Sequence, residues 1–387
     1  MARNILAGID VGTHVVRVVV AELGKGAVLP HIIGTGYAES RGLRHGYVIH
    51  HHDALESVSA AVRAAEKSSG VKIKDTYLSI GGVSLESTVA NGSSVSSRAD
   101  GEVTDLDVEK ALKSSEDSLG NIQNKKIIEV IPIRFKLDGK EVLGRPEGMK
   151  GMKLEVKTLF ITCLDHHLKD LVETVEEAGV DVIDYVPAPV AASLVALTKK
   201  QRTVGCVLVN IGAETVSLVV YEDDVPISLQ VFPIGSTDIT NDIALGLKIP
   251  LEEAERLKLG SSSDNYPKKK LDEIIEARLS DIFDLIDAHL KKIGRNELLP
   301  AGVILTGGGV GIGTIEDLAK ASLKLPSKTA APMILAREKG QMRDSSWFVA
   351  YGLCIYGANR GRNSYGSGAN IGPLWEPIKG WLKELLP

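Results

Sequence analysis

Two segments of the sequence combine an apolar run with a glycine turn, and both have the composition of a phosphate-binding loop. The first reads AGIDVGTHVVRVVVAEL, and the second reads LVNIGAETVSLVVYEDD. When the two are aligned, Asp10 falls opposite Asn210 and Gly12 falls opposite Gly212. A glycine has no Cβ, so phosphate oxygens can approach the backbone N–H groups of its turn closely. Each segment predicts a β-hairpin in the core, although one such turn alone could equally be structural.

A third glycine segment makes the phosphate interpretation stronger. It reads VILTGGGVGIGTIEDLAK and predicts a buried strand, a glycine turn and a helix that begins near Thr314. Asp10 ends the first predicted strand, and Mg²⁺ bound to phosphates needs only one or two carboxylates. Two glycine hairpins that face each other could therefore hold a triphosphate, with Asp10 as the ligand of the metal.

Helices must position these turns, and they are expected where apolar residues recur at a spacing near 3.6. The two similar hairpins indicate two related lobes. The segment 83–160 mixes strand-forming runs with one helix and predicts a separate α+β subdomain. The expected helices span 53–68, 107–119, 166–178, 189–199, 251–259 and 271–292.

Composition narrows the class of protein. The 387 residues are 44% hydrophobic and 25% charged, which predicts a folded chain of more than one lobe. The net charge is −5 and no basic, aromatic stripe is present, so nucleic acid is not expected as a partner. Three widely separated cysteines predict reduced thiols and a cytoplasmic location. No apolar run approaches the ~20 residues that span a bilayer, so membrane contact is expected to be peripheral.

The carboxyl-terminal residues predict such a contact. The segment 358–373 is rich in Gly, Ser and Asn, as in a flexible linker, and 374–387 has the spacing of an amphipathic helix that Pro377 can begin. A terminal helix packed on the core is the alternative. The residues expected to enter the membrane are Leu374, Trp375, Ile378, Trp381, Leu382 and Leu385.

These motifs resemble the actin, Hsp70 and hexokinase superfamily, and within it the sequence is similar to the FtsA family of bacterial cell division proteins. GIDVGTHVVRVVV resembles the first phosphate loop, VNIGAETVSLVVY the second, and ILTGGG the adenosine loop. ESRGLRHGYVIHHHDALESV, IPIRFKLDG and RPEGMKGMKLEV resemble stretches characteristic of FtsA. The resemblance implies an α/β, actin-like two-lobed fold of duplicated ribonuclease-H-like domains, with an inserted FtsA-type α+β subdomain.

The resemblance also divides the chain into subdomains. The first lobe (1A) is expected from 1–82, 161–198 and 346–357, the FtsA-type insert (1C) from 83–160, the second lobe (2A) from 199–232 and 301–345, and subdomain 2B from 233–300, followed by the linker 358–373 and the membrane helix 374–387.

By resemblance, the cofactors are ATP and Mg²⁺, and Glu255 and Lys258 face the nucleoside. An ordinary solvated ion pair between these two residues is the alternative. Arg278 aligns with a position that helps to receive the tail of FtsZ, or it pairs with Asp281 along its helix. The implied nucleotide contacts are Asp10, Gly12, Thr13, His14, Asn210, Gly212, Ala213, Glu214, Thr215, Glu255, Lys258, Gly307, Gly308 and Gly309.

The sequence departs from the superfamily pattern where hydrolysis would need charge. Relatives have Asp and consecutive glycines in the second loop, whereas this chain has Asn210, Ala213 and Glu214. Glu214 would repel phosphates if it faced them. Ala188 stands where several relatives place a carboxylate that orients water. We therefore assign no catalytic residue and expect at most slow hydrolysis.

The resulting hypothesis is an ATP-binding, non-enzymatic scaffold. It would polymerise head to tail on the inner membrane face, at the division site, and tether FtsZ there. One alternative is an adaptor of pilus assembly that resembles PilM. Another is an active ATPase or chaperone of the same superfamily, although the residues after Gly357 are too few for a substrate domain.

Overall fold

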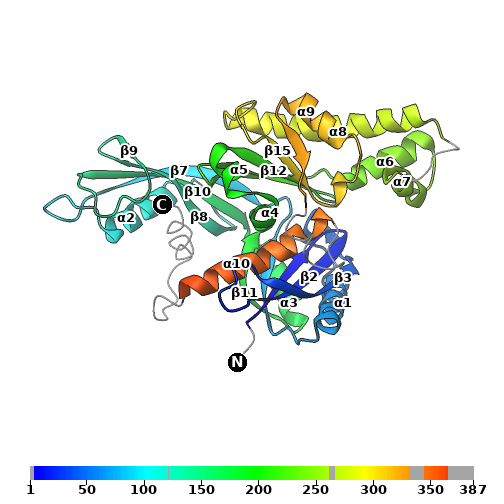
Figure 1. Ribbon diagram of the computed structural model, residues 1–387, viewed down its shortest axis with the longest axis horizontal. Coiled ribbons are helices and arrows are strands. Elements are labelled where there is room, and N and C mark those ends of the chain that lie inside the picture. The colour runs from blue at the N-terminus through cyan, green and yellow to red at the C-terminus, as the bar shows by residue number, and fades with distance from the viewer. Residues whose placement is uncertain (1–3, 121, 261–265, 332–343, 365–387) are drawn as a thin grey trace.

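The computed structural model describes residues 4–120, 122–260, 266–331 and 344–364. Three large β-sheets with helices on their faces make up most of this part of the chain (Figure 1). The first and third sheets contain the two glycine hairpins, and the second sheet belongs to the predicted insert.

The first sheet has the strand order β11-β6-β1-β2-β3. Neighbours among β1, β2 and β3 are antiparallel, while β6 and β11 run parallel to β1. Helices α1 and α3 pack on one face, and α4 and α10 pack on the other. The elements are β1 (Ile5–Val11), β2 (Val15–Glu22), β3 (His31–Glu39), the short pair β4 (Leu43–Arg44) and β5 (Tyr47–Val48), α1 (His51–Ser69), β6 (Asp75–Ile80), α3 (Asp165–Glu177), β11 (Asp181–Pro187), α4 (Ala188–Ala196) and α10 (Phe348–Ser364).

The third sheet repeats this plan, with the order β14-β13-β12-β15-β16. One face contacts α4, and the other is covered by α6, α7, α8 and α9. The elements are α5 (Lys199–Val204), β12 (Cys206–Ile211), β13 (Val216–Glu222), β14 (Val225–Phe232), α6 (Ser236–Leu247), α7 (Leu251–Lys258), α8 (Lys268–Lys292), β15 (Val303–Thr306), η1 (Gly308–Val310), α9 (Ile315–Leu323), β16 (Ser327–Thr329) and η3 (Ser345–Trp347).

The two sheets match in strand direction as well as in order. In each, three antiparallel strands are followed by two strands parallel to the first strand of the hairpin. The prediction of two related lobes, made from the similarity of their hairpins, is therefore confirmed.

The second sheet forms the insert, with the order β7-β10-β8-β9 and antiparallel pairing throughout. Helix α2 covers one face of its outer half through Val108, Ala111 and their apolar neighbours. In Figure 1 this sheet extends to one end of the molecule, while α6 and α7 lie at the other end. The elements are β7 (Glu86–Val95), α2 (Asp105–Asp117), β8 (Lys125–Leu137), β9 (Lys140–Val142) and β10 (Lys153–Leu164).

Each of the six helices predicted between residues 53 and 292 is present, with at least one end shifted. The helix expected at 189–199 already ends at Ala196, and Thr198 then caps the short α5 with its side chain. Helix α8 begins three residues before the predicted position, directly after Pro267. Proline fixes φ near the helical value and lacks the N–H that a first turn leaves unpaired, so helices readily begin there.

The predicted start of the linker is wrong. Helix α10 continues through Ser364, seven residues beyond Gly357. Ala358 is buried in the core, and Arg360 forms an ion pair with Asp184 of β11. These tertiary contacts hold a polar sequence in a helix. The predicted membrane helix 374–387 lies outside the described residues.

Two further sequence expectations concern cysteines and membrane spans. Cys163, Cys206 and Cys354 are free and buried, as predicted. Among the helices of the described ranges, none combines the length and the apolar character needed to cross a bilayer.

Candidate nucleotide site

The first glycine turn joins β1 to β2 and contains Gly12, Thr13 and His14. A Cβ on Gly12 would lie 2.9 Å from the carbonyl oxygen of Val15. In the second turn a Cβ on Gly212 would lie 2.9 Å from the carbonyl oxygen of Thr215. Both glycines are thus required by the same tight backbone geometry, which is what the aligned sequences predicted.

Asp10 lies next to the end of β1, directly opposite Arg17 of β2. Its carboxylate accepts a hydrogen bond of 2.7 Å from the hydroxyl of Ser79 on β6. Burial raises the pKa of Asp10, while the Ser79 bond and the positive charge of Arg17 act in the opposite direction. The guanidinium of Arg17 is itself drawn over the ring of Trp347, at 5.7 Å from the ring centre. A carboxylate that is partly desolvated fits the role of Mg²⁺ ligand, since a bound cation would favour its ionised form.

The second and third turns touch each other. Gly307 has φ of +100°, and a Cβ there would lie 2.3 Å from the side-chain oxygen of Asn210 and 2.4 Å from the carbonyl oxygen of Ile211. A Cβ on Gly309 would lie 3.0 Å from that of Ser236. Glycine is therefore needed at 307 for both its backbone conformation and the close approach of the second turn.

The amino terminus of α6 is hydrogen-bonded to the second glycine turn. The carbonyl oxygens of Gly212 and Ala213 accept hydrogen bonds from the N–H groups of Ser236 and Thr237, at 2.9 and 2.8 Å. The N–H groups at the start of a helix can bind an anion, but these two N–H groups of α6 are already bonded to the second glycine turn. Phosphate contact at this turn would therefore fall to the N–H groups of the turn itself.

Glu214 of the second turn contacts the first lobe, which the sequence did not predict. Its carboxylate accepts a hydrogen bond of 2.6 Å from the backbone N–H of His45, and the Nδ1 atom of His45 lies 3.1 Å from the Glu214 carbonyl oxygen. His45 lies between β4 and β5 in the first lobe and has φ of +49°. Glu214 thus joins the two lobes, and its negative charge is paired with a backbone N–H group.

His45 is a residue of the site region that the sequence reasoning missed. Its backbone contact with Glu214 bridges 169 positions of sequence. The signal was present in the family-typical stretch ESRGLRHGYVIHHHDALESV, where a glycine follows His45.

Glu255 and Lys258 form an ion pair of 2.7 Å, but it is not an ordinary solvated pair. Lys258 is 7% exposed, and its ammonium also donates to the Ser236 carbonyl oxygen at 3.1 Å and to the Thr240 hydroxyl at 2.8 Å. Because an ammonium has three N–H groups, all of them are used within the protein. The side chain of Glu255 is 44% exposed, which makes it the member of the pair that is open to a ligand.

The ionisation of Glu255 depends on charged and polar groups from both lobes. The pKa of Glu255 is lowered: burial would raise it, but bonds from Lys258 and Thr240 outweigh burial, and the charge of His14 adds to them. His14 belongs to the first glycine turn, so the structure brings that turn and α7 into electrostatic contact. Thr13, Thr215 and Gly308 lie in the same turns as their predicted neighbours.

Two other predicted positions lie on helices outside the glycine turns. Arg278 on α8 makes a forked contact with Asp242 on α6, at 2.6 and 3.1 Å, and a longer one of 3.4 Å with Asp281. The expected partner Asp281 is therefore secondary to a residue of another helix. Ala188 begins α4 and is buried in the core, where it offers no polar group to a water molecule.

Comparison with family models supports the assignment of the sequence motifs. The model described as "Cell division protein FtsA" matches residues 207–352, and the model described as "SHS2 domain inserted in FTSA" matches residues 82–162. The second range nearly coincides with the described insert, β7 to β10.

Curated relatives match almost the whole chain. The sequence is 30% identical to the cell division protein FtsA of Borreliella burgdorferi, over 92% of this chain and 91% of that protein. It is 25% identical to FtsA of Pseudomonas aeruginosa, over 98% of each chain, and 27% identical to FtsA of Bacillus subtilis, over 95% of this chain and 86% of that protein.

Solved structures share the fold at low sequence identity. A chain of the PilM-PilN type IV pilus biogenesis complex matches with a TM-score of 0.69 and 17% identity, over 91% of this chain and 98% of that one. MreB5 of Spiroplasma citri bound to ADP matches with a TM-score of 0.54 and 15% identity, over 94% and 99%. Together with the matched insert, these likenesses confirm the predicted fold, actin-like and two-lobed with an inserted α+β subdomain.

Proposed function

Since the chain belongs to the FtsA family of cell division proteins, we propose that it is an ATP-binding scaffold that polymerises on the inner membrane face and tethers FtsZ there. The observation that carries this proposal is the 30% identity to an FtsA protein over nine tenths of both chains. The structural support is the contact between the second and third glycine turns and the bond from His45 to Glu214, which joins the first lobe to the second turn.

ATP with Mg²⁺ is the proposed ligand of these turns. Asp10 supplies the metal ligand, the turn N–H groups supply phosphate contacts, and Glu255 faces the nucleoside. MreB5 of Spiroplasma citri, which has the same fold, has been solved bound to ADP and bound to AMPPNP. Hydrolysis is expected to be slow or absent, because Asn210 and Ala188 provide no carboxylate for metal or water.

The alternatives have less support. The likeness to the PilM-PilN complex, at 17% identity, concerns the fold, whereas the curated relatives at 25–30% identity are FtsA proteins. An active ATPase or chaperone would need a competent hydrolytic site. Several relatives have a water-orienting carboxylate at the position of Ala188, but Ala188 has no polar side-chain group and is buried among apolar side chains.

The membrane part of the proposal depends on the sequence of 374–387. Trp381→Glu places a charge on the apolar side of the predicted helix, so we expect this variant to be lost from the lipid fraction in liposome flotation while ATP binding is unchanged. Lys379→Glu, on the polar side, is the matched control and should float like the parent. Equal flotation of Trp381→Glu and the parent would place the anchor elsewhere and favour a PilM-like adaptor.

Arg278 is proposed to help bind the carboxyl-terminal tail of FtsZ. Because Arg278 also pairs with Asp242 within the protein, the test must separate the two roles. Arg278→Gln removes the charge and also breaks the contact with Asp242; Asp242→Asn weakens the same contact but keeps the arginine. We expect Arg278→Gln to weaken binding of an FtsZ tail peptide about tenfold in fluorescence anisotropy, and Asp242→Asn to leave it near the parental value.

Equal losses in the two variants would show that the ion pair between α6 and α8 matters for structure alone. Unchanged affinity in both would remove Arg278 from the peptide site.

A further inference from the structure

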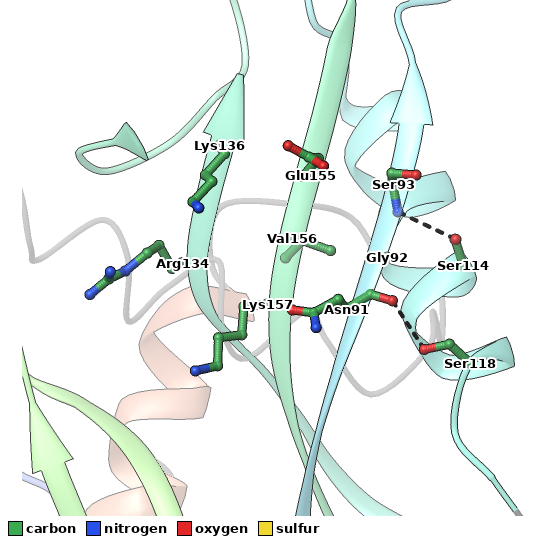
Figure 2. Close-up of a pocket in the computed structure, with 10 residues that line it drawn as sticks. All are labelled: Asn91, Gly92, Ser93, Ser114, Ser118, Arg134, Lys136, Glu155, Val156 and Lys157. Carbon is green, nitrogen blue, oxygen red and sulfur yellow. Dashed lines mark hydrogen bonds between the residues drawn. The ribbon is translucent and has the colours of Figure 1, made fainter. Parts of the chain in front are cut away.

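The insert carries a polar pocket on its sheet that the proposed function does not use. Its volume is about 480 Å³, within the range of ligand-binding pockets. Figure 2 shows cationic side chains on β8 and β10 beside polar groups of β7 and α2. The lining residues are Asn91, Gly92, Ser93, Ser114, Ser118, Arg134, Lys136, Glu155, Val156 and Lys157.

The register of the sheet places like charges side by side. Lys157 of β10 is paired with Arg134 of β8 on one side and with Asn91 of β7 on the other. Directly opposed like charges destabilise a sheet, because their Cβ atoms are only about 5 Å apart. All three side chains of this row carry N–H donors, and an anion bound across it would relieve the repulsion.

The next row of the sheet, formed by Glu155 of β10 and Lys136 of β8, does not neutralise the positive charge of Lys157 and Arg134. Glu155 lies opposite Lys136 but forms its ion pair with Lys153, at 2.7 Å. In the described part of the chain, neither Lys136 nor Lys157 has a carboxylate within ion-pair distance. Arg134 has one, Glu141, at 3.1 Å. The pocket is therefore positive on a chain whose net charge is −5.

Backbone groups at the β7 edge of the sheet, beside this row, already have hydrogen-bond partners on α2 or at its end. The N–H of Ser93 donates to the hydroxyl of Ser114, and the hydroxyl of Ser118 donates to the carbonyl oxygen of Asn91, as the dashed lines in Figure 2 indicate. A ligand would thus bind to the side chains on the face of the sheet, and addition of a further strand to β7 is disfavoured here.

The spacing of the cations indicates the kind of anion. Arg134 and Lys136 are two residues apart on one strand, so they share a face and are separated by about 7 Å. Carboxylates on alternate residues of an extended peptide have the same separation, whereas a single phosphate can bridge only one opposed pair such as Arg134 and Lys157. We propose that this face binds an extended acidic segment of a partner protein, with carboxylates at every second residue.

The test uses a labelled synthetic peptide with Glu at every second position and Ser between, measured by fluorescence anisotropy with the full chain. Reversing two cations in Lys136→Glu/Lys157→Glu should weaken binding at least about tenfold, since each contact joins opposite charges. The matched control Lys67→Glu/Lys320→Glu makes the same change in net charge on exposed sites of α1 and α9, and should retain parental affinity. Thermal melting checks that both variants are folded.

Two further probes separate the possible anions. A peptide of the same composition with its Glu residues contiguous should bind several-fold more weakly, and equal binding would refute the spacing argument. Inorganic phosphate should displace the peptide only at far higher concentration. If phosphate competes as well as the acidic peptide, or if vesicles containing phosphatidylglycerol bind through Lys136 and Lys157 while the peptide does not, the proposal of an acidic protein partner is overturned.

Discussion

Replacing Lys258 with methionine is expected to lower the free energy of unfolding by about 3 kcal/mol. The buried ammonium satisfies the Ser236 carbonyl, the Thr240 hydroxyl and the Glu255 carboxylate together, and methionine fills the space without satisfying any of them. This loss of about 3 kcal/mol is at the lower end of the range for removing one partner of a buried ion pair, because water can still reach the half-exposed Glu255. Urea unfolding at neutral pH measures the change.

Two further variants make this expectation specific. Lys270→Met removes an exposed lysine from the first turn of α8 and should change the free energy of unfolding by less than about 0.5 kcal/mol. The double variant Glu255→Gln/Lys258→Met should lose less stability than Lys258→Met alone, because no unpaired charge is left. If Lys258→Met is as stable as Lys270→Met, the three contacts of the ammonium do not hold α6 and α7 together.

Asp10→Asn is expected to weaken binding of ATP in the presence of Mg²⁺ by about a hundredfold, equivalent to about 3 kcal/mol. The amide has nearly the shape of the carboxylate and can still accept the hydrogen bond from Ser79, so the loss reports the missing charge. Without Mg²⁺ the same variant should bind ATP at least as well as the parent, because a negative charge near the phosphates has been removed.

Calorimetry with and without Mg²⁺ distinguishes these effects. Ser79→Ala is the control, since it removes the hydroxyl donor but keeps the carboxylate, and its effect should be several-fold at most. Parental affinity of Asp10→Asn for ATP with Mg²⁺ would mean that another group holds the metal.

The contacts between the lobes suggest how nucleotide and lobe position are connected. Glu214 and His14 each belong to a glycine turn of one lobe and interact with the other lobe, through His45 and Glu255 respectively. A ligand that contacts both turns would therefore alter the surroundings of Glu214 and Glu255, so we expect the relative position of the lobes to depend on bound nucleotide.

The sequence by itself was sufficient for features that depend on local geometry. Gly12 and Gly212 were identified because a tight turn between strands restricts the residue type at one position. Apolar runs on either side of a glycine turn predicted the strands of the two hairpins, and the apolar spacing near 3.6 predicted the six helices between residues 53 and 292. The duplicated hairpins indicated two lobes because each lobe repeats the same local plan.

Only the tertiary structure decided how side chains far apart in the chain pair with one another. Spacing suggested Asp281 for Arg278, but the packing of α6 on α8 brings Asp242 closer. Composition suggested a linker after Gly357, but the burial of Ala358 extends α10. The contact of Glu214 with the backbone N–H of His45 joins residues 169 positions apart, and no local pattern in the sequence predicts it. Hydrogen bonds and ion pairs form between whatever groups packing brings within about 3 Å, and a sequence specifies such distances only for near neighbours on one element.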